Sequence, residues 1–124
     1  MTGLSFLAKS LFPIVYYAYP VVYACGVYQI RRSETFSTWL ADLSDGRARV
    51  RIAQRIDRLA AGNPGDVEPV GKGVSELRID YGPGYRVYFK RTDRIVYVLL
   101  CGGTKGTQEA DIRQAIVIAE SLKR

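Results

Sequence analysis

Histidine is absent from this 124-residue chain, which excludes Ser-His-Asp and Cys-His catalysis and removes the commonest zinc ligand. The two cysteines, Cys25 and Cys101, form neither a CxxC pair nor a disulfide framework. We therefore expect reduced thiols in a cytoplasmic protein, with no metal and no cofactor. Any acid–base chemistry must use carboxylate, amine, guanidinium or phenol groups.

Acidic side chains are in the minority, since eighteen Lys and Arg stand against twelve Asp and Glu, a formal net charge of +6. Thirteen of the eighteen are Arg, whose planar guanidinium suits bidentate contact with phosphate. This balance favours a polyanionic partner such as nucleic acid. A chain of this length has room for one domain with one modest core.

Charge is missing altogether from the 21 residues between Lys9 and Arg31, a run as long as a membrane span. Pro13 and Pro20 interrupt this run and its tyrosines are scattered, so it would make a poor spanning helix. Two interpretations stay open for residues 1–26: an apolar N-terminal extension that anchors the protein to a membrane, or sequence that is not translated because synthesis starts at Val27. Finding Met1 in the intact mass of the native product would reject the second.

Residues 27–124 have the periodicity of a folded domain, and their first half predicts one strand and two helices. Residues 27–32 alternate as a strand, and Ser33 is a suitable N-cap for a helix over 34–43. That helix has apolar residues at helical spacing: Phe36, Trp39, Leu40 and Leu43. A second helix over 47–61 ends at a Gly-Asn-Pro stop and is expected to form a hairpin with the first. Its expected buried residues are Ile52, Ala53, Ile56, Leu59 and Ala60.

The second half predicts three strands and a helix after an exposed loop over 63–73 that carries Lys72, a candidate for RNA contact. The strands are expected over 75–80, 85–90 and 95–101, the third apolar throughout because both of its faces are covered. A loop over 102–108 then leads into a helix over 109–122. The order β-α-α-β-β-β-α predicts an α+β fold, a mostly antiparallel sheet packed against an N-terminal helical hairpin and a C-terminal helix.

Three basic features are candidates for phosphate contact. Alternation along the strands places Arg78 and Arg86 on one open face of the sheet, with Leu77 and Ile79 turned to the core. The loop bearing Lys105 precedes a helix N-terminus, which suits phosphate, although its glycines are equally explained by a tight turn. The second helix has Arg51, Arg55 and Arg58 on one face, joined by Arg47 and Arg49, which either contacts RNA or an acidic partner or is only solvated.

Three stretches together resemble the HigB-like addiction module killer branch of the RelE/ParE toxin superfamily. They are FxxWLxxL at 36–43, GKGVSELRIDYGPGYRVYF at 71–89 and LLCGGTKGTQEADIRQA at 99–115. The resemblance covers residues 28–122 in order, and only the first 26 residues lack a counterpart. It implies the RelE/ParE fold, which has the element order expected above.

The resemblance implies the toxin of a type II toxin–antitoxin system, an endoribonuclease (mRNA interferase) that enters the ribosomal A site, cuts messenger RNA and inhibits translation without a metal. Its partners would be the ribosome and a cognate helix-turn-helix antitoxin, with operator DNA bound only by the toxin–antitoxin complex. Two other functions stay open. One is inhibition of DNA gyrase without catalysis, as in the ParE branch, and the other is a membrane-anchored interaction protein.

The resemblance also implies roles for particular residues. Arg86 and Lys105 match the basic positions that would stabilise transition-state charge, and Arg78 is the next candidate. The general base is harder to assign, because some relatives have Tyr, His or Lys where this chain has Asp111, and Lys where it has Glu76. Asp111 is either the acid–base group or a cap of the last helix. Two further residues are candidates for RNA contact, and each also has a purely structural explanation. Gln108 either positions RNA or bonds within its loop, and Tyr88 either stacks on a base or packs in the sheet.

Overall fold

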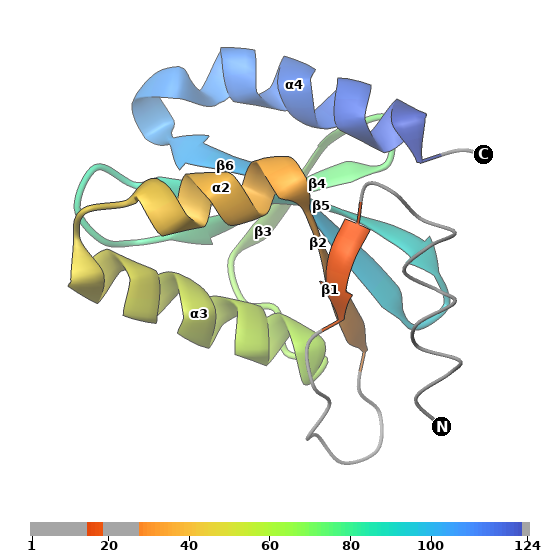
Figure 1. The fold of residues 1–124 in the computed structure, drawn as a ribbon, viewed down its shortest axis with the longest axis horizontal. Helices are drawn as coiled ribbons and strands as arrows, with labels where there is room; N and C mark the ends of the chain where they lie inside the picture. The colour runs from red at the N-terminus through yellow and green to blue at the C-terminus, as the bar shows by residue number, and fades with distance from the viewer. Residues whose placement is uncertain (1–14, 19–27, 123–124) are drawn as a thin grey trace.

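The computed structural model describes residues 15–18 and 28–122, which fold into one six-stranded sheet with three helices (Figure 1). The strands are β1 (Val15–Ala18), β2 (Gln29–Ser33), β3 (Val67–Gly71), β4 (Val74–Ile79), β5 (Tyr85–Asp93) and β6 (Val96–Thr104). The helices are α2 (Glu34–Asp42), α3 (Gly46–Ala60) and α4 (Gln108–Ser121), and a 3₁₀ turn, η1 (Lys105–Thr107), precedes α4. The α+β class and the expected order are confirmed, with β3 and β1 as additions.

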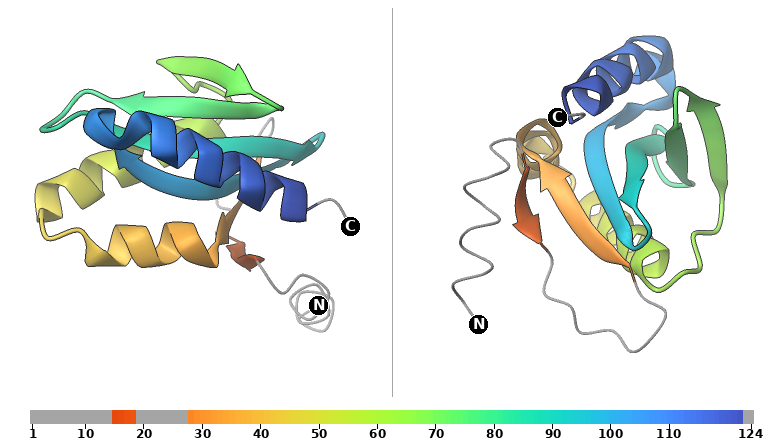
Figure 2. Two further views of the ribbon diagram at one scale, coloured as in Figure 1. Left: turned by 90° about the horizontal axis from the view of Figure 1, so that it is seen from above. Right: turned by 90° about the vertical axis from the view of Figure 1, so that its right-hand side faces the viewer.

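The sheet has the strand order β1-β2-β6-β5-β4-β3, and β2 with β6 is its parallel pair. The remaining neighbours are antiparallel, so the sheet is mostly antiparallel as expected. Helices α2 and α3 pack on one face and α4 on the other, an arrangement visible in the two views of Figure 2. Both faces of the central strands are therefore covered.

Each face of the sheet has its own apolar core. Leu77, Val87 and Leu99 pack with Phe36 of α2 and Ile52 of α3 on one side. The core on the other side consists of Val74, Tyr88, Val98, Leu100 and Cys101 with Ala115 and Ala119 of α4. Because β6 contributes side chains to both cores, it is apolar along its length, as predicted.

The two N-terminal helices begin at side-chain caps. The Ser33 hydroxyl accepts a hydrogen bond from the Phe36 N–H at 3.0 Å and donates to the Leu100 carbonyl of β6 at 2.6 Å. Asp45 caps α3 by accepting from the N–H groups of Arg47 and Ala48 at 3.0 and 3.2 Å. The Ser33 bond fixes the start of α2 to the central strand, because the same hydroxyl is used twice.

The structure corrects three expectations. Residues 63–73 are not all loop, because Val67–Gly71 forms β3, an edge strand in which Pro69 is tolerated since edge strands leave backbone groups unpaired. Residues 102–104 continue β6, so the expected loop is shortened to the turn η1. Along α3, the buried residues follow one another at intervals of three or four and begin at Ala48, which was not expected to be buried. Ala53 lies beside this stripe and is exposed.

Most of the N-terminal extension lies outside the described residues, and so do Val27 and Cys25. Within it, Val15–Ala18 pairs antiparallel with β2 as strand β1. The start at Val27 and the membrane anchor therefore stay predictions. No helix in the described ranges is long and apolar enough to cross a membrane.

Candidate functional site

Arg86 and Lys105 come together where β5 and β6 end. Strand pairing sets Arg86 opposite Gly103, and the Lys105 N–H donates to the Gly84 carbonyl at 2.8 Å. A Cβ placed on Gly84 would lie 3.3 Å from Lys105 Cβ and 3.7 Å from Arg86 Nη1. Gly84 has a φ of 83° in the left-handed region that glycine favours. The two side chains therefore flank one point of the β4–β5 turn.

Glu76, on β4, lies beside Arg86 and is fully buried. Its carboxylate accepts hydrogen bonds from the Arg78 Nε at 3.0 Å, the Tyr88 hydroxyl at 3.0 Å and the Gln108 Nε2 at 2.6 Å. Arg86 Nε lies 3.5 Å from the same carboxylate. The expectation that this face of the sheet is open is therefore wrong here, because α4 covers it and Glu76 is held inside.

Tyr88 is also fully buried on this face, where its hydroxyl donates to Glu76. Burial, then the hydrogen bond and charge of Glu76, raise the pKa of the Tyr88 phenol, which keeps it a neutral donor. A ring without exposed surface has no face on which a base could stack. The structure favours packing over base stacking for Tyr88.

Arg78 and Arg86 differ in how much of their charge is compensated. Arg78 lies within 3.8 Å of Asp66, 3.2 Å of Glu68 and 3.0 Å of Glu76, so it links β4 to β3 through several carboxylates. Arg86 is 12% exposed and faces Glu76 with its Nε. Among the described residues, none accepts a hydrogen bond from the terminal nitrogens of Arg86. A phosphate oxygen would therefore find free donors on Arg86, whereas Arg78 is already occupied.

Lys105 is exposed and has no carboxylate within salt-bridge distance in the part of the chain that the structure describes. It is the first residue of η1, whose backbone is held by a hydrogen-bonded chain. The Thr104 N–H donates to the Thr107 hydroxyl at 3.2 Å, and that hydroxyl donates to Asp111 at 2.5 Å. Lys105 is thus an uncompensated cation on a braced turn.

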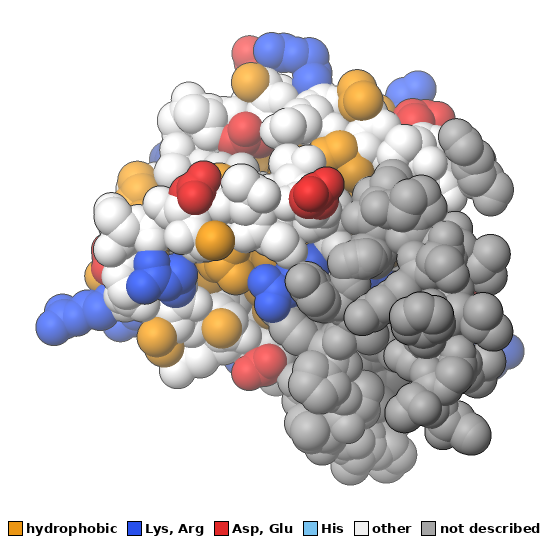
Figure 3. All heavy atoms as spheres, viewed as in Figure 1, with side chains coloured by type: hydrophobic (Ala, Val, Ile, Leu, Met, Phe, Trp, Pro, Cys, Tyr) orange, Lys and Arg blue, Asp and Glu red, His pale blue; other side chains and the backbone are white. Residues whose placement is uncertain are grey.

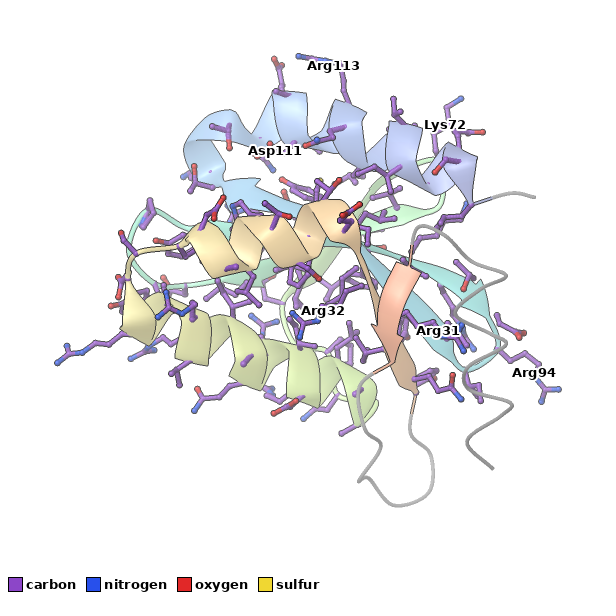
Figure 4. All side chains as sticks on the ribbon, viewed as in Figure 1. Arg31, Arg32, Lys72, Arg94, Asp111 and Arg113 are labelled. Atoms are coloured by element: carbon purple, nitrogen blue, oxygen red, sulfur yellow. The ribbon has the colours of Figure 1, made fainter. Side chains whose placement is uncertain are left out.

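Asp111 lies on the first turn of α4 between that helix and the end of β6, while Arg113 points away from the sheet (Figure 4). A Cβ on Gly103 would lie only 1.8 Å from its Oδ2, and a Cβ on Gly102 would lie 2.3 Å from the Trp39 ring. The Gly-Gly pair therefore lets α2 and α4 approach β6 from opposite faces. Asp111 supports the Lys105 turn through Thr107, and no backbone N–H of α4 is bonded to it as a cap would require.

The arginines of α3 do not act as one uniform face. Arg55 donates to the backbone carbonyls of Arg78 and Pro64, so it joins α3 to β4 and to the following loop. The guanidinium of Arg51 lies 4.8 Å from the centre of the Tyr81 ring, whose hydroxyl donates to Asp45 at 3.3 Å. Arg58, together with Arg47 and Arg49, is exposed.

Arg47 and Arg51 line a shallow hollow of about 880 Å³ with Asp45, Gly46, Val50 and Gln54. Figure 3 shows Lys and Arg side chains beside an apolar strip between α2 and α3 on this side of the molecule. The start of α3 lies at the same end of the sheet as the β4–β5 turn and the start of α4 (Figure 1). These arginines and the Arg86–Lys105 pair therefore share one end of the protein.

Lys72 is not at that end. It occupies the β3–β4 turn with a φ of 55° and lies far from Asp111 (Figure 4). Gln108, by contrast, is brought into the site, where it bonds to Glu76. Among the described residues, no three His, Cys, Asp or Glu side chains are grouped as metal ligands would be.

Sequence reasoning missed the central place of Glu76 and the role of Thr107. Strand alternation turned Glu76 toward solvent, because a carboxylate at a period-2 polar position is typical of an exposed face. A possible signal was the tyrosine two residues after Arg86, since Tyr88 lies opposite Glu76 in the β4–β5 register. A buried carboxylate needs such donors.

Comparison with known proteins gives two matches. The family described as phage derived protein Gp49-like (DUF891) matches residues 38–124. An uncharacterized protein of Haemophilus influenzae is 49% identical over 94 residues, which are 76% of this chain and 95% of the relative.

Proposed function

This chain belongs to the phage-derived Gp49-like family, and from that premise we propose that it is the toxin of a type II toxin–antitoxin pair that cuts messenger RNA in the ribosomal A site. One observation carries the proposal: Arg86 and Lys105 flank Gly84, and the described residues leave their terminal nitrogens free for a phosphate. The resemblance of residues 71–89 and 99–115 to HigB-like toxins in the RelE/ParE superfamily gives that phosphate its source, an RNA backbone.

In the proposed reaction a ribose 2′-hydroxyl loses its proton to water and its oxygen attacks the adjacent phosphorus. The 5′-oxygen of the next nucleotide leaves and takes up a proton from water, which gives a 2′,3′-cyclic phosphate and a 5′-hydroxyl. The negative charge that develops on the non-bridging oxygens is stabilised by Arg86 and Lys105. Both cations are held before the substrate arrives, Arg86 against Glu76 and Lys105 on a braced turn, so little reorganisation is needed. Loss of one such group is expected to lower the cleavage rate about 100-fold or more.

Asp111 has a supporting role in this proposal. Its carboxylate is engaged by the Thr107 hydroxyl and lies against Gly103, so it holds the turn that presents Lys105. If Asp111 instead moves a proton in the reaction, Asp111→Asn abolishes cleavage while Thr107→Val leaves it intact. A supporting role predicts a partial loss in Thr107→Val and a smaller one in Asp111→Asn, because the asparagine carbonyl can still accept the hydrogen bond of the Thr107 hydroxyl.

The RNA would extend from the Arg86–Lys105 pair toward the start of α3. Arg47 and Arg51 lie at that end of the molecule, and phosphate contacts from such side chains add affinity without reading sequence. Arg55 contributes indirectly, because its guanidinium is engaged by backbone carbonyls. We propose a cytoplasmic toxin whose activity is neutralised by a helix-turn-helix antitoxin.

Controlled expression of the full chain in bacteria tests this function. The proposal predicts growth arrest with new transcript ends inside translated codons, and no such ends when translation initiation is blocked. Arrest with inhibited DNA supercoiling and intact transcripts would favour a gyrase inhibitor of the ParE kind instead. Arrest with neither effect, or no arrest in any host tested, would contradict both.

A further inference from the structure

We propose that Glu76 is a positioning residue, which orients the guanidinium of Arg86 toward Lys105 and ties it to the start of α4. The inference rests on the proposed function for its meaning in catalysis, whereas the geometry behind it stands independently. A carboxylate with no exposed surface is costly unless its lone pairs are used. Glu76 meets this requirement with groups from three separate elements.

The β4–β5 register shows why a carboxylate is needed here. Arg78 and Arg86 lie directly opposite one another, and like charges in such a pair repel. Glu76 lies two residues before Arg78 on the same face, with Arg78 Nε at 3.0 Å and Arg86 Nε at 3.5 Å. One buried negative charge therefore separates two adjacent positive charges, and it lets both side chains stay on this face.

The contact with Glu76 also fixes the direction in which Arg86 points. A guanidinium is planar, so holding its Nε edge sets the plane of the whole group. The 3.5 Å separation exceeds a good hydrogen bond, and Arg86 Nε is buried with no other described partner, so the contact is chiefly charge attraction. The opposite edge, with Nη1 beside Gly84, is left facing the side of Lys105.

Gln108 extends the same control to the second cation. Its Nε2 donates at 2.6 Å to the Oε2 atom that also faces Arg86. Gln108 is the first residue of α4 and follows the η1 turn, which begins at Lys105. A single carboxylate oxygen thus links the strand that bears one cation to the turn that presents the other.

A double-mutant cycle separates positioning from general structural support. We expect Glu76→Gln to slow ribosome-bound mRNA cleavage at least 10-fold at saturating protein, because the amide has lost the charge that holds Arg86. Arg86→Ala alone is expected to be slower still. If Glu76 acts through Arg86, adding Glu76→Gln to Arg86→Ala causes less than a 2-fold further loss. If the rate reductions of the two single variants multiply in the double variant, the proposal is overturned.

Glu68→Gln is the matched control. It makes the same chemical change in an exposed carboxylate that contacts Arg78 at 3.2 Å but not Arg86, and cleavage should be unchanged. Should Glu76→Gln fold poorly because it leaves the largely buried Arg86 without its counter-charge, the double variant, which has lost that arginine, is expected to be the more stable of the two. The opposite order of stability would contradict the pairing of Glu76 with Arg86.

A measurement without RNA tests the geometry by itself. In the ¹⁵N spectrum of the full chain, the Arg86 Nε–H is expected to exchange slowly with water, and Glu76→Gln should speed that exchange at least 10-fold, with Glu68→Gln showing no change. If the wild-type chain cleaves no RNA but the exchange result holds, the proposed function fails and the positioning contact stands. If cleavage is found and the exchange rate is insensitive to Glu76, the positioning proposal fails alone.

Discussion

The close approach of α4 to β6 at Gly103 gives a sharp prediction about stability. A methyl group at residue 103 would lie 1.8 Å from Asp111 Oδ2, 2.6 Å from Asp111 Cγ and 2.9 Å from Thr107 Oγ1. Contacts this short cannot be relieved by a rotation of the methyl group, so Asp111 or the first turn of α4 must move. Overpacking of this kind costs about 1–3 kcal/mol.

The clash is mainly with one side chain, so removing that side chain should remove most of the cost. Asp111→Ala is expected to cost about 1 kcal/mol by itself, through the lost Thr107 hydrogen bond. In the Asp111→Ala background, Gly103→Ala should then cost less than half of what it costs in the wild type. The two substitutions are in contact, so a coupling of roughly 1–2 kcal/mol is expected.

Urea unfolding of the four proteins, followed by circular dichroism, measures this coupling. For a domain of this size, Gly103→Ala alone should lower the thermal midpoint by about 4–12 °C. Equal costs of Gly103→Ala in both backgrounds would refute the argument that Asp111 occupies the space beside Gly103. So would a Gly103→Ala variant as stable as the wild type.

Three further predictions concern stability. Ser33→Ala should lower the free energy of unfolding by about 1–3 kcal/mol in urea titrations, because it removes a buried cap and leaves the Leu100 carbonyl without its donor. Burial, and then the charge of Asp111, raise the pKa of the Cys101 thiol to about 12. In a Cys25→Ser chain, a thiol reagent at pH 8 should therefore label Cys101 only when the protein unfolds. The free energy of unfolding should also fall as the pH rises from 9 toward 12, because the unfolded thiol ionises in that range and the folded one does not. Arg55→Gln should destabilise the fold measurably whereas Arg47→Gln should not, since the described structure bonds only the first guanidinium to backbone carbonyls; equal midpoints in thermal melts would contradict this.

The fold was largely predictable because its signals are local. Period-2 alternation located β4 and β5, and the apolar run of β6 correctly predicted a central strand covered on both faces. Ser33 and the Gly-Asn-Pro stop marked helix ends within a residue or two. Edge strand β3 was missed, because Pro69 and its glycine neighbours are equally typical of a loop and only pairing with β4 distinguishes the two.

The candidate site was predictable in its cations and not in its carboxylate. Arg86 follows the GPG turn that joins two strands, and Lys105 lies in the GGTKGTQ segment that leads into the last helix. The structure brings both residues together beside Gly84. The burial of Glu76 depends on α4 crossing the sheet above it, a contact between distant segments that no local pattern reports. The same contact explains why Tyr88 packs inside.

The central claim is that Arg86 and Lys105 together hold an RNA phosphate, and cleavage by the purified full chain on programmed ribosomes tests it most directly. Single-turnover rates at a defined A-site codon should fall about 100-fold or more in Arg86→Ala and in Lys105→Ala, with circular dichroism spectra that show both variants folded at the assay temperature. Cleavage at the wild-type rate by both variants, in the same assay and with the same fold, would contradict the account.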